Sequence, residues 1–414
     1  MPMPPAANGH FSCRSCGSHE IDSVISFGHT PLADRLLTKE DLGQPEPLAP
    51  LDLVFCRSCS LVQISETVAP ELLFRDDYPY FSSVSKTLLD HSRENALELI
   101  RSRSLSSSSL VVELASNDGY MLKNFVEQGI PVLGIDPAGA PTRAAIEAGI
   151  PTMQAFFGLE IARQLRTEGR TADLVIANNV LAHVADLNGF VEGISTILKP
   201  SGVAVIEVPY VVDLIDRCEF DTIYHQHLCY FSITALSALF RRHNLFLNVA
   251  RRISIHGGSV RLFVETHENV QPSVRDLLEE EHSRGVDGFA YYKSFAQRVN
   301  QIRSRLQDLL ASLKAQQKRI VGYAAAAKAT TLLAYCGIDG SILDYIVDRN
   351  VYKQGRFMGG GRLPIHSPAR LLEDKPDFIL LLAWNFADEI LKQQQPYRDL
   401  GGRFVIPIPE PQIV

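Results

Sequence analysis

The stretch Val112-Glu113-Leu114-Ala115-Ser116-Asn117-Asp118-Gly119-Tyr120 begins as a strand, continues as a turn of small and polar residues, and ends where a helix pattern starts. A strand, turn and helix of this kind bring backbone N–H groups and a helix N-terminus close to a bound ligand. We therefore predict a cofactor site here. Its contacting residues would be Glu113, Ala115, Asn117, Asp118 and Gly119.

Apolar strand patterns alternate with helix patterns on both sides of this stretch. Such alternation is typical of a doubly wound α/β domain with a mostly parallel sheet. The predicted helices cover 86–100, 120–128 and 141–148. The predicted strands cover 110–114, 132–136, 174–178 and 203–208.

A second α/β unit follows a long helix-compatible segment at 273–319. It comprises strands at 320–323, 343–348, 378–382 and 404–408 and a helix at 327–336. We expect two Rossmann-like units joined by a helical spacer, behind a small N-terminal module. The predicted boundaries are 1–80, 81–270 and 271–414.

Four of the seven cysteines form two C-x-x-C pairs, Cys13 with Cys16 and Cys56 with Cys59. Two such turns complete a tetrahedral Zn²⁺ shell of four sulfurs, and a closed shell makes the metal structural. The alternative of four unrelated thiols requires two C-x-x-C pairs to occur near one terminus by chance. The other cysteines lack metal spacing, and we expect buried free thiols at Cys218, Cys229 and Cys336.

Composition excludes several classes of protein. The chain has 414 residues, 46% of them hydrophobic, which suits two or three globular domains. Its net charge is −7 and no long basic run occurs, so a nucleic-acid partner is not expected. No apolar stretch approaches the roughly 20 residues of a membrane helix, and the N-terminus lacks a secretory pattern. We expect a cytoplasmic monomer.

Asp136 closes the second predicted strand, where an acidic side chain can accept both hydroxyls of a ribose. The turn after Glu113 lacks the G-x-G-x-x-G pattern that brings backbone close to a diphosphate. S-adenosylmethionine (SAM), which has no phosphate, therefore fits better than NAD. Asn178 and Asn179 end the next strand and are expected at the same cofactor. A fold with no ligand and an incidental acid is the alternative.

The segment Phe220 to Phe231 concentrates side chains that exchange or donate protons. It contains Tyr224, His225, His227 and Tyr230. Histidine removes a proton near pH 7, and tyrosine donates a hydrogen bond to a developing oxyanion. We predict the reaction centre here and add His183, which follows Asn179. The alternative is an aromatic strand packed on the core.

With these motifs in place, the chain resembles the three-domain, zinc-containing, SAM-dependent sugar C-methyltransferases of bacterial antibiotic pathways. Those enzymes methylate C-3 of nucleotide-linked 4-keto deoxysugars. Besides the segments already quoted, the resemblance rests on Tyr78 to Ser83, His256 to Arg261, Gly322 to Leu333, Trp384 to Glu389 and Gly401 to Phe404.

The resemblance implies a zinc-ribbon-like module, a central class I SAM methyltransferase domain and a C-terminal Rossmann-like domain that binds the nucleotide sugar, here expected to be linked to thymidine diphosphate. A base takes the C-3 proton, and the enolate carbon attacks the methyl group of SAM. His227 matches that base, and Tyr224, Gln226, His183 and Tyr78 match residues around it. The implied substrate contacts are Tyr80, Ser82, His225, His256, Lys328 and Lys353.

Three departures from the family pattern stand out. Gln226 replaces a glutamate; its amide could orient His227 but could not stabilise an imidazolium by charge, so Gln226→Glu would be expected to raise kcat. No acid precedes Phe156, which leaves stacking and backbone contacts for the adenine. Alanines fill the turn at 324–330, where the family has glycines, although Lys328 there could still meet a diphosphate.

Three other functions stay open at this point. One is a bifunctional enzyme that also reduces the 4-keto group with NADPH, against which the alanine-rich turn argues. Another is a SAM-dependent enzyme acting on a different keto compound, which Gln226 allows. The third, a zinc-ribbon adaptor without activity, is opposed by the cofactor turn and the His/Tyr segment.

Overall fold

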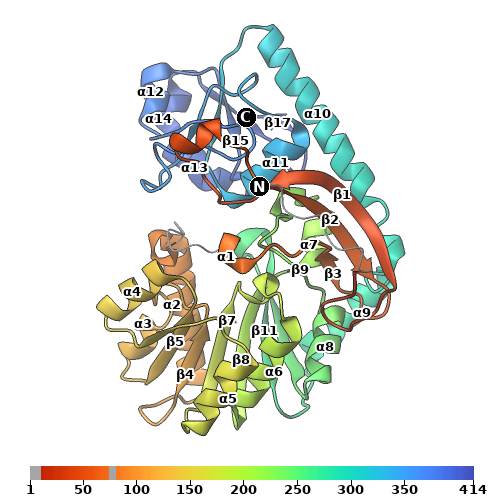
Figure 1. Ribbon diagram of the computed structural model, residues 1–414, viewed down its shortest axis with the longest axis vertical. Coiled ribbons are helices and arrows are strands. Elements are labelled where there is room, and N and C mark those ends of the chain that lie inside the picture. Colours follow the sequence, from red (N-terminus) through yellow and green to blue (C-terminus); the bar gives the residue numbers. More distant parts are fainter. Residues whose placement is uncertain (1–10, 74–80) are drawn as a thin grey trace.

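The computed structural model describes residues 11–73 and 81–414 and contains three β-sheets (Figure 1). The central sheet lies in the lower half of the view and the C-terminal sheet in the upper half. The long strands β1 (Ile21–Pro31) and β2 (Leu48–Cys56) run between them along one side. The predicted α/β fold with an N-terminal four-cysteine module is confirmed.

The central sheet has the order β10-β11-β8-β7-β4-β5-β6. The five strands from β8 to β6 are parallel, and β11 runs antiparallel to both β8 and β10, so the sheet is mixed. The winding direction reverses between β4 and β7, which is where an open α/β sheet binds its ligand. The strands are β4 (Val111–Leu114), β5 (Val132–Asp136), β6 (Thr152–Gln154), β7 (Ala172–Asn178), β8 (Leu198–Pro209), β10 (Phe246–Ile253) and β11 (Ser259–Glu265).

Side-chain caps begin several helices in the N-terminal and central parts of the chain. Ser85, Asp186 and Ser232 each accept a hydrogen bond from a backbone N–H three residues later. The helices are α1 (Pro70–Leu73), α2 (Lys86–Ser102), α3 (Lys123–Val126), α4 (Gly139–Glu147), α5 (Leu159–Thr167), α6 (Leu187–Ile197), α7 (Val211–Asp216) and α8 (Ile233–Arg242). The 3-10 helices are η1 (Glu40–Gly43), η2 (Ser82–Val84), η3 (Leu181–His183), η4 (Phe220–Thr222) and η5 (Ile255–Gly257).

One predicted helix is much shorter than expected. The pattern at 120–128 yields only the four-residue α3. The side chain of Asn124 donates to the carbonyls of Tyr120 and Met121, and this local bonding competes with helical hydrogen bonds.

The N-terminal sheet is antiparallel and draws one strand from the central part of the chain. Its order is β1-β2-β3-β9, with β3 (Val62–Ile64) paired to β9 (Cys229–Tyr230). Residues 229–230 lie within the His/Tyr segment, shortly after His227. The predicted reaction centre is therefore joined by backbone hydrogen bonds to the cysteine module.

The helical spacer at 273–319 is two helices, α9 (Pro272–Ser283) and α10 (Phe295–Ala315), with the 3-10 helix η6 (Phe289–Tyr291) between them. Gly285 has a φ of 71° and ends the first helix. The helix-compatible segment is therefore helical, and a turn at this glycine divides it into two helices.

The C-terminal sheet has the order β14-β13-β12-β15-β16-β17 and is parallel except for its last strand. The predicted strand at 343–348 is only two residues long. The strands are β12 (Ile320–Tyr323), β13 (Ile346–Val347), β14 (Ile365–His366), β15 (Phe378–Leu381), β16 (Arg403–Ile406) and β17 (Gln412–Ile413). The helices are α11 (Ala327–Cys336), α12 (Arg370–Asp374), α13 (Ala387–Gln393), α14 (Gln395–Asp399) and η7 (Trp384–Phe386).

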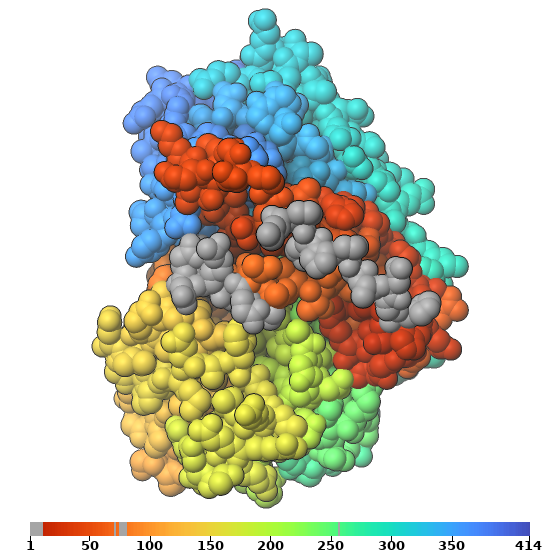
Figure 2. Space-filling view, viewed as in Figure 1, coloured from red at the N-terminus to blue at the C-terminus, as the bar shows by residue number. Residues whose placement is uncertain are grey.

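Buried apolar residues of all three parts form one continuous core cluster, from Cys13 to Ile408. Figure 2 shows the N-terminal residues, in red and orange, lying across the boundary between the blue C-terminal part and the yellow and green central part. In residues 11–73 and 81–414, no helix has the length and hydropathy needed to cross a membrane.

Candidate active site and metal centre

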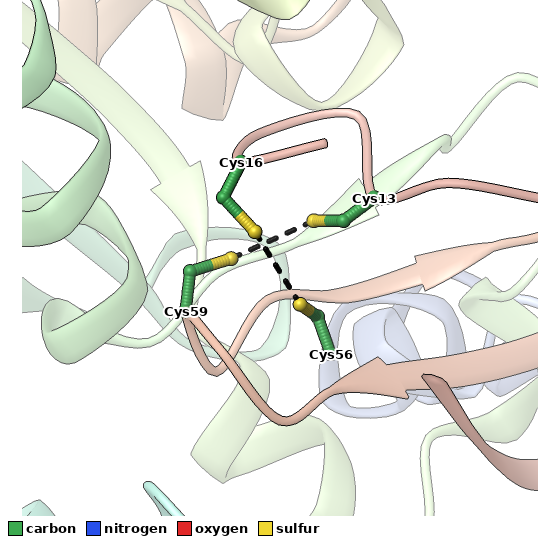
Figure 3. Close-up of side chains that lie close together, drawn as sticks. All are labelled: Cys13, Cys16, Cys56 and Cys59. Atoms are coloured by element: carbon green, nitrogen blue, oxygen red, sulfur yellow. Dashed lines mark hydrogen bonds between the residues drawn. The ribbon is translucent and has the colours of Figure 1, made fainter. Parts of the chain in front are cut away.

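The four cysteines of the two C-x-x-C pairs come together (Figure 3). Their sulfur atoms all lie within 4.8 Å of one another, with Cys13 Sγ 3.5 Å from Cys59 Sγ and Cys16 Sγ 3.6 Å from Cys56 Sγ. Each pair lies on a tight turn. Gly17 N donates to the Cys13 carbonyl, and Ser60 N donates to the Cys56 carbonyl.

The electrostatics of this cluster fit a divalent cation. A hydrogen bond from Cys59 lowers the pKa of Cys13 to about 4, whereas burial raises the pKa of Cys56 to about 11. Four thiolates this close repel one another unless a cation compensates them. Among the described residues the four cysteines form a complete tetrahedral ligand set, so a Zn²⁺ held by them would be structural.

The predicted cofactor turn at the end of β4 is tightly wound. Ala115, Asn117 and Gly119 have φ values of 55°, 50° and 77°. The carboxylate of Asp136 accepts from Asn117 N and from Ala138 N, each at 2.8 Å. Asp136 therefore shapes the turn and keeps lone pairs for further donors.

Residues from η2 cover this turn. Ser82 N donates to Asn117 Oδ1 at 2.9 Å, and Ser83 N donates to Asp118 Oδ2 at 3.1 Å. Ser82, predicted to contact substrate, is thus placed at the cofactor turn through its backbone.

Three carboxyl groups gather below the turn: Glu113, Asp118 and Asp136. Burial, reinforced by the other two acids, raises the pKa of Glu113 well above its usual value; burial also raises the pKa of Asp136. Buried oxygens of Glu113, Ser116, Asp118 and Asn178 find no hydrogen-bond partner among the described residues. SAM carries a sulfonium and an ammonium, and these acids and acceptors suit such a ligand better than a diphosphate.

The remaining predicted cofactor residues flank this group. Asn179, with a φ of 55°, donates its N–H to the Glu207 carbonyl on β8 at 2.8 Å. Phe156 follows β6 and is 56% exposed, so its ring is open to a stacking partner.

His227 and Tyr224 form a hydrogen-bonded pair. Tyr224 Oη lies 3.0 Å from His227 Nε2, and His227 Nδ1 lies 2.8 Å from the Thr222 carbonyl oxygen. A carbonyl only accepts, so Nδ1 carries the proton. Nε2 is then the basic nitrogen and accepts from the phenol.

His183 packs edge-on against His227, with ring centres 4.8 Å apart. Burial lowers the pKa of His183 to about 4, an effect that hydrogen bonds to the backbone of Gln226 and Asn179 partly offset. A neutral His183 adds no positive charge beside His227.

The structure places two side chains of this segment away from their predicted partners. The amide of Gln226 does not orient His227, because its Nε2 donates to the Ala33 carbonyl at 3.5 Å while Thr222 holds Nδ1 of His227. His225 is fully buried and its Nε2 lies 3.0 Å from the Pro50 carbonyl on β2. It therefore packs into the N-terminal module and does not face substrate.

The two predicted substrate lysines are both engaged by this chain. The Lys328 ammonium lies 4.2 Å from the centre of the Trp384 ring, and the Asp221 and Glu219 carboxylates oppose the lowering of its pKa by burial. Its charge is already balanced, which does not favour the predicted diphosphate contact.

Lys353 joins the alanine-rich turn to the N-terminal module. Its Nζ donates to the Ala325 carbonyl at 2.8 Å and lies 3.4 Å from Asp34. Asp348 accepts from Ala325 N. Both the N–H and the carbonyl of Ala325 in this turn are thus hydrogen-bonded to groups of the chain itself.

Three predicted residues lack a structural account. Tyr78 and Tyr80 lie outside the described residues. His256 belongs to η5, but its side chain is also outside the description.

A buried charged cluster that the sequence reasoning missed lies beside the cofactor residues. Glu207 on β8 pairs with Asn178 of β7, accepts from Arg261 Nε at 2.6 Å and lies 2.9 Å from His91 Nε2. The sequence does contain one signal of this cluster: Glu207 is an acid within the otherwise apolar predicted strand 203–208. The cluster borders a cavity of about 640 Å³ whose lining includes His91, Glu94, Arg252 and Arg261.

The reversal point of the central sheet, the acid-lined turn and the histidine pair define a SAM-dependent methyltransferase. Family models match a zinc binding domain at residues 13–74, a methyltransferase domain at 89–247 and a C-methyltransferase C-terminal domain at 254–409. The chain is 37% identical over 406 residues to the C-methyltransferase NovU of Streptomyces niveus, covering 97% of this chain and 96% of NovU. The chain belongs to this C-methyltransferase family.

More distant similarities cover smaller parts of the chain. A ubiquinone biosynthesis O-methyltransferase of Bartonella tribocorum is 26% identical over 97 residues, 23% of this chain and 39% of that protein. The solved structure of a Burkholderia thailandensis 1,6-didemethyltoxoflavin-N1-methyltransferase is 14% identical, with a TM-score of 0.37, over 50% of this chain and 95% of that one.

Proposed function

We propose that the protein transfers a methyl group from SAM to C-3 of a nucleotide-linked 4-keto deoxysugar. The observation that carries the proposal is the hydrogen-bonded state of His227, whose Nδ1 donates to Thr222 and whose Nε2 is left basic. A positioned neutral imidazole is a general base near pH 7.

The chain's residues have defined tasks in this reaction. Nε2 of His227 takes the C-3 proton, and the C–H electron pair moves to form an enolate with the 4-keto oxygen. The residues of the turn after β4 would hold SAM, which would supply an electrophilic methyl group for C-3 of the enolate, with the C–S bonding pair going to sulfur. Proton transfer turns His227 into an imidazolium, which the Thr222 carbonyl dipole faces. In catalytic triads a carboxylate takes this place.

The Tyr224 hydroxyl can donate a hydrogen bond to one acceptor before the proton transfer and to another after it. In the structure its hydroxyl donates to Nε2 of His227 at 3.0 Å. Nε2 must give up that bond to take a proton, and the hydroxyl is then free to donate to the enolate oxygen. His183 stays neutral and avoids like-charge repulsion with the imidazolium.

A cavity lies between the central and C-terminal parts, and Arg252 and Arg261 line it. Both are paired within the chain, Arg252 with Asp213 and Arg261 with Glu207, so a diphosphate bound there would share these guanidinium groups with the carboxylates. Thymidine diphosphate is the nucleotide we propose for the sugar acceptor, on the family resemblance.

Methyl transfer from SAM labelled with ¹³C in its methyl group tests this function. With a thymidine-diphosphate-linked 4-keto-2,6-dideoxyhexose, NMR is expected to show the label bonded to C-3. The C-4 ketone signal is expected to persist when NADPH is added. A label on oxygen, or none at all, would refute the proposed reaction, and loss of the ketone would establish the bifunctional alternative.

A further inference from the structure

The 3-10 helix η4 is the point where all three parts of the protein meet. Phe220 of η4 stacks on Phe27 of β1 with ring centres 6.2 Å apart and meets Tyr335 of α11 at 5.8 Å. Phe27 and Tyr335 also touch edge-on at 4.9 Å. All three rings are buried, so the backbone of η4 is anchored from two sides.

The C-terminal domain also makes polar contacts with the two residues that flank Thr222. Trp384 Nε1 donates to Asp221 Oδ2 at 2.7 Å, and Thr331 Oγ1 donates to the Ile223 carbonyl at 2.7 Å. Asp221 is fully buried, so its hydrogen bond forms away from competing water.

Lys328 strengthens the first of these contacts. Its ammonium stands over the Trp384 ring at 4.2 Å and attracts the Asp221 carboxylate. The indole ring thus has the Lys328 ammonium over its face and donates its N–H to the Asp221 carboxylate.

These contacts fix the carbonyl that sets the protonation state of His227. Asp221 and Ile223 are held by the C-terminal domain, and the Thr222 carbonyl between them lies 2.8 Å from His227 Nδ1. A peptide plane has little freedom when both of its neighbours are pinned.

We propose that Trp384 and Thr331 are positioning residues for the methyl transfer: through η4 they hold the Thr222 carbonyl against His227 and keep the proton on Nδ1. Neither residue has to touch the acceptor. The inference rests on the proposed function in one respect, that His227 is the base. The tautomer of His227 can be measured without any acceptor bound.

The test uses the zinc-loaded full chain with ¹⁵N-labelled histidine. The His227 signals are assigned among the 12 histidines by comparison with His227→Asn. Trp384→Phe removes the indole N–H and keeps the ring over Lys328, and Thr331→Val removes only the hydroxyl. Tyr397→Phe is the control, since it removes a buried hydroxyl that donates to the Pro376 carbonyl in the same domain.

We expect Trp384→Phe and Thr331→Val to convert His227 from the Nδ1–H form to a mixture of both tautomers. The affinity for SAM is expected to stay unchanged, and kcat is expected to fall about tenfold, the equivalent of one neutral hydrogen bond. The control is expected to keep the parental tautomer even if its Tm falls.

Parental ¹⁵N shifts in either folded variant would remove that residue from the proposal. A tautomer change in Tyr397→Phe would overturn the proposal, because general loosening of the domain would then explain the effect. If Trp384→Phe does not fold, Thr331→Val decides alone. Methyl transfer to another acceptor would refute the proposed function and leave this measurement valid.

Discussion

Tyr224 and His227 are joined twice: the Tyr224 hydroxyl lies 3.0 Å from His227 Nε2, and His227 N donates to the Tyr224 carbonyl at 2.8 Å. The second bond closes a tight turn over 224–227. The Y-x-x-H spacing therefore brings the phenol and the imidazole together locally, before any tertiary contact forms.

The zinc site should be required for stability. Cys13→Ser leaves three thiolates, and we expect loss of about one zinc per chain together with a lower Tm, because metal-binding energy is folding energy. Metal analysis and thermal melts of protein purified without added zinc measure both. Cys336→Ser is the matched control, since Cys336 is buried in α11 far from the cluster in sequence. Undiminished zinc in Cys13→Ser would contradict the four-cysteine site.

Asp136 should be needed for SAM binding. Asp136→Asn removes one of two acceptors for the turn's N–H groups and the acid expected on the ribose. We expect an affinity loss of about 1 to 3 kcal/mol, measured by calorimetry. Asp173→Asn is the control, because Asp173 accepts from Leu110 N at the opposite end of the sheet. Equal affinities of Asp136→Asn and the parent would contradict the assignment, as would tighter binding of NADPH than of SAM.

His183 should make the fold sensitive to acid. Its pKa falls from 6.5 to about 4 on folding, so its contribution is complete above pH 6.5 and is lost as pH falls toward 4. Over that window, we expect the free energy of unfolding of His183→Asn to fall by up to about 3 kcal/mol less than that of the parent.

Urea unfolding at pH 6.5 and pH 5.0, with zinc present throughout, measures this difference. His282→Asn is the control. His282 Nδ1 donates to the Asp287 carboxylate, and this hydrogen bond raises the pKa of His282, so its stabilisation grows as pH falls and its removal should steepen the decline. Parallel pH curves for His183→Asn and the parent would show that His183 is solvated.

The sequence predicted the elements whose signals are local. Both C-x-x-C pairs, the turn after Glu113 and strands 132–136 and 320–323 needed only spacing and periodicity. The contacts of Gln226 could not be predicted, since its partner Ala33 is 193 positions away. The family pattern placed an acid next to the base, whereas in the structure the backbone carbonyl of Thr222, five positions earlier, holds Nδ1.

Restoring the family residue with Gln226→Glu should therefore destabilise the fold and not raise kcat. Gln226 is 2% exposed and faces the Ala33 carbonyl, where a carboxylate finds an acceptor instead of a donor. We expect a loss of about 1 to 3 kcal/mol at pH 8.

The pH dependence identifies the cause. Burial raises the pKa of such a glutamate above its unfolded value of about 4.3, so the loss is absent below that pH and grows as pH rises. Gln226→Met, which removes the amide without adding charge, is the control and should show no such pH dependence. A gain in kcat with parental stability would return Gln226 to the role of orienting His227.

The most direct test of His227 as the base is hydrogen exchange without methyl transfer. In D₂O, without SAM, NMR follows loss of the C-3 proton of a thymidine-diphosphate-linked 4-keto-2,6-dideoxyhexose. Thermal melts first establish that the parent and His227→Asn are folded. We predict rapid exchange with the parent and exchange at least about 100-fold slower with His227→Asn, the usual scale of general base catalysis. Undiminished exchange in folded His227→Asn would contradict the account.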